Sequence, residues 1–142
     1  MRILVIDDDR SVSAAIEASL HRQGCEVVLV ENGRLGIRAF ETSNFDAVMV
    51  DIFMPEMDGL ETIRRFRRQA PTVPIIAMSG FRFRDSRGGA APDFLSIAAT
   101  LGATYCLRKP FGPEQLMAAV SSHLEPDAKS DALGGQLRRD LR

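Results

Sequence analysis

Residues 2–11 read RILVIDDDRS, an apolar run that ends directly in three aspartates. The apolar run predicts a buried strand, and Asp9 or Ser11 carries a side chain that can cap a helix starting there. Helix capping accounts for one acid but not for three. Asp7 and Asp8, crowded at the end of a buried strand, would repel each other and resist ionisation. The stretch therefore predicts a strand followed by a helix, with a cation that neutralises the acids between them.

Apolar runs and helical patterns alternate along the rest of the chain. Short apolar runs predict strands at 2–6, 26–30, 46–50, 74–78 and 104–108. Helical spacing predicts helices at 11–23, after the Asn-Gly turn at 32–33, from the Asp-Gly pair at 58–59, at 92–101, and from 113 to about 124. Continuous apolar strands between helices are typical of a parallel sheet covered on both faces. We predict an α/β fold, a flavodoxin-like doubly wound five-stranded parallel sheet in the order 2-1-3-4-5 with helices on both faces.

The helical patterns also predict which side chains face the core. In the helix after the Asn-Gly turn we expect Leu35, Ala39 and Phe40 to point inward. In the helix that follows the Asp-Gly pair, the arginine-rich stretch RRFRR at 64–68 predicts a solvated basic face. A charge run of that kind is usually a solvated face, so it gives little reason to expect DNA binding.

Composition and length limit the classes of protein to consider. The 142 residues fit one domain, at 45% hydrophobic and 26% charged residues with a formal net charge of -1. Cys25 and Cys106 show no CxxC spacing, which fits free thiols in a reducing cytoplasm. We find no signal peptide and no apolar stretch approaching the roughly 20 residues that span a bilayer. We expect a cytoplasmic domain over 1–124 and a flexible C-terminal tail over 125–142.

Polar side chains follow four of the five predicted strands. Asp7 and Asp8 end the first strand, Asp51 the third and Ser79 the fourth, and Lys109 follows the fifth. In a doubly wound sheet these carboxyl ends share one edge, where ligands bind at the topological switch point. Mg2+ suits a site of converging carboxylates and completes its shell with water and phosphate oxygens. Asp51 can act as a nucleophile that carries a phosphoryl group, with the lysine and serine neutralising its charge.

Four motifs in this order, ILVIDDD, MVDIFMPEMDG, PIIAMSG and GATYCLRKPF, resemble the receiver domain of two-component response regulators. The resemblance covers residue 1 to about 124 and implies that Asp51 is the phosphoacceptor, with Ser79 and Lys109 contacting the phosphoryl oxygens. It further implies that Mg2+ or Mn2+ is bound by Asp7, Asp8, Asp51 and the backbone carbonyl of Phe53. It also implies a cis peptide bond between Lys109 and Pro110. Asp9 then serves the N-terminus of the following helix or the outer shell of the metal.

The resemblance also implies partners. The phosphoryl donor is expected to be a sensor histidine kinase or a histidine phosphotransfer protein, and the chain is a phosphoacceptor signalling protein rather than an enzyme. With no output domain in the sequence, we expect a stand-alone receiver that acts through an unknown downstream protein, without direct nucleic-acid binding or membrane insertion. A homodimer is compatible with the sequence, which does not specify the oligomeric state.

Three positions depart from the family pattern or extend it. Cys106 occupies the place of the usual switch aromatic, and Tyr105 should point to the other side of the strand. Phe53 is bulky where polar side chains often influence water attack, which predicts slow loss of the phosphoryl group. The segment 81–93, FRFRDSRGGAAPD, is longer than usual. It is interpreted either as a lid that docks a partner or an anion, or as a mobile polar loop.

Two alternative interpretations are compatible with part of the sequence. The stretch DDDRS fits the start of haloacid-dehalogenase-like phosphatases, with Asp7 as nucleophile and Asp9 as acid/base, but it leaves DIFMPEMDG unexplained. The other alternative is an unphosphorylated pseudo-receiver that only binds partners. The intact set of Asp51, Ser79 and Lys109 argues against it.

Overall fold

The computed structural model describes residues 1–54, 59–80 and 94–124. Its strands are β1 (Arg2–Ile6), β2 (Glu26–Val30), β3 (Ala47–Asp51), β4 (Ile75–Ser79) and β5 (Tyr105–Arg108). Its helices are α1 (Arg10–Arg22), α2 (Gly33–Thr42), α3 (Gly59–Gln69), α4 (Phe94–Leu101) and α5 (Pro113–Leu124). The strands form one parallel sheet in the order β2-β1-β3-β4-β5, which confirms the predicted topology. Predicted and observed strand ends differ by one residue in β3, β4 and β5.

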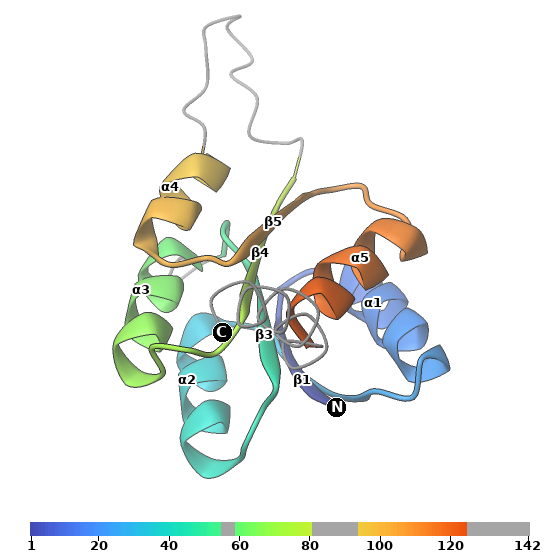
Figure 1. Cartoon of the computed structure of the whole chain (residues 1–142), viewed down its shortest axis with the longest axis horizontal. Helices are drawn as coiled ribbons and strands as arrows, with labels where there is room; N and C mark the ends of the chain where they lie inside the picture. The colour runs from blue at the N-terminus through green and yellow to red at the C-terminus, as the bar shows by residue number, and fades with distance from the viewer. Residues whose placement is uncertain (55–58, 81–93, 125–142) are drawn as a thin grey trace, which may run out of the picture.

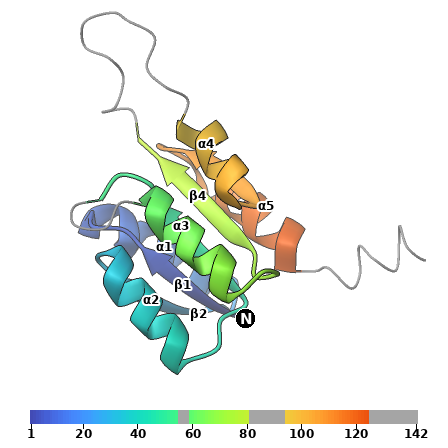
Figure 2. The ribbon, with the colours of Figure 1, turned by 90° about the vertical axis from the view of Figure 1, so that its left-hand side faces the viewer.

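The helices cover the sheet in two layers. Helices α1 and α5 lie on one face, and α2, α3 and α4 lie on the other (Figure 1). The turned view places α2, α3 and α4 side by side in front of the strands (Figure 2). Side chains of β1 alternate between the layers: Ile3 and Val5 pack toward α1 and α5, while Leu4 and Ile6 pack toward the other three helices. Burial on both faces explains why the strands have continuous apolar sequences instead of alternating ones.

Helix α2 corrects one expectation about the core. Leu35 is 39% exposed, and the buried face of α2 consists of Gly33, Gly36 and Ile37. A Cβ atom at Gly36 would lie 2.2 Å from Cδ1 of Ile6, so glycine allows the helix to approach β1 closely. Leu35 therefore lies on the flank of α2, although apolar type alone suggested the inner face.

The arginine-rich stretch of α3 is only partly a solvated face. Arg64 and Arg65 are exposed and pair with Glu61 in the preceding turn. Arg67 instead turns its guanidinium toward backbone carbonyls at the ends of two helices. Its nitrogens donate to carbonyl oxygens after α3 and after α4, with N···O distances between 2.6 and 3.2 Å, at Ala70, Pro71, Val73 and Gly102. The positive charge thus lies where carbonyls and helix dipoles present negative charge.

The interpretation of 81–93, the predicted helix start at 92 and the predicted tail at 125–142 fall outside the described residues. Among the helices that the structure does describe, none has the length and apolar character required to cross a bilayer.

Replacing Arg67 tests its structural role. Arg67→Met keeps an apolar stem of similar length but removes the donors to four backbone carbonyls, which we expect to lower the free energy of unfolding by about 2 kcal/mol. Urea denaturation followed by circular dichroism measures this change. Arg64→Met, one turn earlier on the exposed side of α3, is the matched control and should change stability little. Equal stability of the two variants would contradict the assigned role.

Candidate functional site

The candidate site lies at the carboxyl edge of the sheet, where β1 and β3 are neighbours. The chain leaves β1 to pass through α1 to β2, and leaves β3 to pass through α3 to β4, so the connections diverge at this point. Such a switch point leaves a crevice between the two strand ends. Asp7 directly follows β1, and Asp51 is the last residue of β3.

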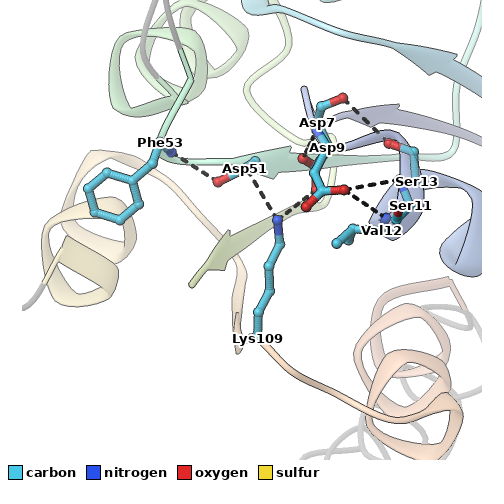
Figure 3. A network of polar contacts seen from close by, with 8 residues as sticks. All are labelled: Asp7, Asp9, Ser11, Val12, Ser13, Asp51, Phe53 and Lys109. Atoms are coloured by element: carbon cyan, nitrogen blue, oxygen red, sulfur yellow. Dashed lines mark hydrogen bonds and ion pairs between the residues drawn. The ribbon is translucent and has the colours of Figure 1, made fainter. Parts of the chain in front are cut away.

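The ammonium group of Lys109 lies between two buried carboxylates (Figure 3). Its Nζ is 2.8 Å from Oδ2 of Asp7 and 3.1 Å from Oδ2 of Asp51. The side chains of Asp7 and Asp51 are 0% and 1% exposed, and that of Lys109 is 14% exposed. Carboxylates so far from water require a positive partner, and here the lysine is shared between them.

Burial determines the electrostatics of Asp51. Removal from water raises its pKa from 3.8 to about 6, and the charge of Asp7 adds to the rise. The backbone hydrogen bond from Phe53 and the charge of Lys109 oppose it. For Lys109, burial lowers the pKa, but the hydrogen bond to Asp7 and the charges of both carboxylates together raise it above its ordinary value. The lysine is therefore a permanent cation, and Asp51 ionises against a cost.

The three aspartates after β1 divide between two roles, helix capping and the acidic cluster around Asp51. Asp9 is the N-cap of α1 and accepts hydrogen bonds from the backbone N–H groups of Ser11 and Val12, which confirms the helix-terminus role expected for it. Asp7 and Asp8 instead turn toward Asp51, and the three side chains offer ligand atoms that lie within 4.8 Å of one another. A set of carboxylate oxygens at this spacing fits a hard divalent cation such as Mg2+.

The loop after β3 supports Asp51 from the opposite side. The backbone N–H of Phe53 donates to Oδ1 of Asp51 at 3.0 Å, while Lys109 binds the other oxygen. Gly59, the first residue of α3, packs against the same loop: a Cβ atom there would lie 2.2 Å from the carbonyl oxygen of Asp51. The sequence indicated Gly59 only as part of a helix start. Its second role, to admit α3 against the aspartate, depends on a close approach that no sequence signal predicted.

Ser79 and Lys109 meet through the backbone. The N–H of Lys109, the residue after β5, donates to the carbonyl oxygen of Ser79, the last paired residue of β4, at 2.6 Å. The end of β4 thus lies between Asp51 and the backbone of Lys109. The Lys109–Pro110 peptide bond is cis, as the family resemblance implied.

Cys106, at the switch position of β5, and its neighbour Tyr105 face opposite layers, as predicted. Tyr105 packs with the core under α1 and α5, whereas Cys106 packs with the core under α4. The Sγ of Cys106 lies 3.5 Å from the carbonyl oxygen of Leu95 in α4. A small side chain thus occupies the place where an aromatic was expected from the family pattern.

Comparison with known sequences decides the family. The family model described as the response regulator receiver domain matches residues 3–121. The chain belongs to the response regulator receiver domain family. Among curated relatives, the response regulator MprA of Mycolicibacterium vanbaalenii is 33% identical over 134 residues, covering 94% of this chain and 54% of the relative. The alkaline phosphatase synthesis transcriptional regulatory protein PhoP of Bacillus subtilis is 26% identical, covering 96% and 57%. This receiver thus spans about half the length of these relatives.

Solved structures show the same fold. The chemotaxis protein CheY4 of Vibrio cholerae superposes with a TM-score of 0.74 at 28% identity, covering 87% of this chain and 98% of CheY4. A response regulator receiver domain protein from Clostridium thermocellum gives a TM-score of 0.77 at 26% identity, covering 89% and 96%. The predicted flavodoxin-like receiver fold is confirmed.

The phosphatase alternative is wrong. The matched family and the curated relatives are response regulators. The structure supplies the physical reason for its failure: the proposed acid/base Asp9 already uses its carboxylate as the N-cap of α1.

The raised pKa of Asp51 predicts a pH-dependent stability difference. Because the folded pKa lies above the unfolded value of 3.8, ionised Asp51 costs stability; this cost accumulates as the pH rises from 3.8 and is complete above about 6. In metal-free buffer, Asp51→Asn should therefore raise the free energy of unfolding at pH 7.5 by about 2 kcal/mol and by much less at pH 4.5. Urea denaturation at both pH values measures the gain. The exposed Glu41→Gln is the control, and a less stable Asp51→Asn at pH 7.5 would contradict the assignment.

Proposed function

We propose that this receiver accepts a phosphoryl group on Asp51 from a sensor histidine kinase or a histidine phosphotransfer protein, in a Mg2+-dependent reaction. The observation that carries the proposal is the pairing of the buried Asp51 with Lys109, beside Asp7 and Asp8. A site built only for packing has no reason to bury two carboxylates against one ammonium group, because apolar residues of similar size would be at least as stable.

The transfer follows from the positions of these side chains. An oxygen of the Asp51 carboxylate attacks the phosphorus of a donor phosphohistidine, the P–N bond breaks, and the imidazole nitrogen retains the electron pair. Lys109, already 3.1 Å from Oδ2 of Asp51, neutralises charge on the phosphoryl oxygens as they arrive. The hydroxyl of Ser79, at the end of the neighbouring strand β4, is assigned as a further donor to a phosphoryl oxygen. Loss of the group is hydrolysis, in which water attacks phosphorus, the bond between phosphorus and the Asp51 oxygen breaks, and inorganic phosphate leaves the restored carboxylate.

The divalent cation, Mg2+ or Mn2+, would be held by the carboxylates of Asp7, Asp8 and Asp51 and by the backbone carbonyl of Phe53. When bound, it supplies positive charge that offsets the repulsion among the acids and the incoming phosphoryl oxygens. The acidic cluster within 4.8 Å supports this assignment.

The proposed domain covers residues 1–124, with 125–142 as an appended tail, and the proposed location is the cytoplasm, where histidine kinases present their phosphohistidine. We assign the output to an unknown downstream protein and no nucleic-acid contact to the receiver itself. The curated relatives extend well beyond the matched segment, so the stand-alone arrangement and the output of the whole protein stay predictions.

Intact-mass measurement tests the acceptor directly. Incubation with Mg2+ and acetyl phosphate should add one labile phosphoryl group to the wild-type chain, and Asp51→Asn should add none. Omission of Mg2+ in the presence of a chelator should reduce the adduct at least about tenfold, because the acidic cluster then lacks its counter-charge. Asp9→Asn, which alters only the cap of α1, is the control and should still be modified. An adduct that persists in Asp51→Asn would contradict the proposal.

The side chain of Phe53 predicts a long-lived adduct. A hydrocarbon ring beside the acceptor loop offers no hydrogen bond to an attacking water, whereas an amide does. Phe53→Asn should therefore shorten the phosphoryl half-life, about tenfold if one good hydrogen bond is gained in the transition state. Decay of the mass adduct after removal of acetyl phosphate measures this. Phe53→Leu, which is equally unable to hydrogen-bond, should decay like the wild type, and equal half-lives for all three chains would overturn the prediction.

A further inference from the structure

A pair of aromatic rings joins the loop after β3 to the first turn of α4. The centroids of Phe53 and Phe94 are 4.8 Å apart, and the ring planes make an angle of 84°. This edge-to-face arrangement is the favoured geometry for two aromatic side chains. The close-up shows the ring of Phe53 pointing away from Lys109 and toward a neighbouring helix (Figure 3). The side chain of Phe53 in the acceptor loop therefore packs on α4.

The other end of this connection reaches the carboxylate of Asp51. The backbone N–H of Phe53 donates to Oδ1 of Asp51 at 3.0 Å, and this bond lowers the pKa of Asp51 by favouring its charged form. Phosphorylation turns the carboxylate into a mixed anhydride, so the negative charge now lies on the phosphoryl oxygens. A hydrogen bond to a charged acceptor is stronger than one to a neutral acceptor. Phosphorylation therefore alters a bond made by the same residue whose ring packs on α4.

Helix α4 rests on β5 over small or buried side chains. Leu95 and Ala98 are buried, and the Leu95 carbonyl accepts from the Sγ of Cys106, which replaces the usual switch aromatic. Ile97 is 40% exposed, so α4 also presents an apolar side chain to solvent. Phe94, at the first position of the helix, makes an aromatic contact with the acceptor loop, and Cys106 has no ring with which to do so.

We infer that the Phe53–Phe94 ring pair is the connection through which the phosphorylation state of Asp51 reaches α4 in this protein. The inference rests on the proposed phosphoacceptor function and assigns to Phe94 a positioning role in its regulation. By thermodynamic linkage, a partner that binds α4 and displaces Phe94 also changes the equilibrium at Asp51. The ring pair thus performs a task that the residue at Cys106 cannot.

The test uses the full 142-residue chain with Mg2+ and beryllium fluoride, a stable stand-in for the phosphoryl group, followed by backbone amide NMR. One set of amides reports the acceptor, at Ala77 and Met78 of β4, which pair with the end of β3. The second set reports α4, over residues 95–101. Wild type should respond in both sets. Phe94→Leu should keep the β4 response, while its α4 shift changes fall below about half of the wild-type value. Adding Phe53→Leu to Phe94→Leu should lower the α4 response no further.

Phe40→Leu is the matched control. Phe40 makes a similar edge-to-face contact with Phe66, at 5.0 Å and 83°, within the same core cluster but away from the acceptor loop. It should leave both responses intact, since loss of a ring from this core does not by itself break the connection. An undiminished α4 response in Phe94→Leu, or an equal loss in Phe40→Leu, overturns the inference while the β4 response still supports the proposed function. A wild-type chain without a β4 response overturns both.

Discussion

One ammonium group shared by two buried carboxylates governs this edge of the molecule. Asp7 and Asp51 end neighbouring strands, and neither side chain is more than 1% exposed. Two carboxylates so placed cannot both ionise without a nearby cation, and Lys109 provides it from two strands away. The lysine reaches both because its long stem extends over the end of β4 toward β3. A strand order that separated β1 from β3 would leave these charges without a common partner.

Close backbone packing holds the surrounding loops in place. Gly59 allows the start of α3 to contact the backbone of Asp51, and Gly36 allows α2 to contact Ile6 at the end of β1. At the opposite end of α3, Arg67 joins the carbonyl ends of α3 and α4. Helix α3 is thus held at both ends. At its start Gly59 has no side chain and allows close backbone packing, and near its end the guanidinium group of Arg67 binds carbonyl oxygens. Phosphoryl chemistry needs such rigidity, because small displacements of the reacting groups are costly.

The layer that contains α4 differs from the family pattern in a consistent way. Cys106 leaves the aromatic switch position of β5 small, and Phe53 places a ring in the acceptor loop. The two departures are complementary, because an aromatic contact to α4 is made from the loop after β3 instead of from β5. Tyr105 faces the opposite layer and belongs to the packing of α1 and α5.

The sequence by itself determined the fold class, the strand order and the identity of the polar residues at the carboxyl edge. Apolar runs of strand length and glycine-punctuated helices are local signals, and parallel topology then brings Asp7, Asp51 and Lys109 to one edge. Three features depended on the tertiary structure alone: the exposure of Leu35, the carbonyl contacts of Arg67 and the ring pair of Phe53 and Phe94. Each depends on which elements pack against each other and on how each helix is rotated about its own axis. No pattern within a single helix or strand encodes that, since it emerges only when both layers pack against the sheet.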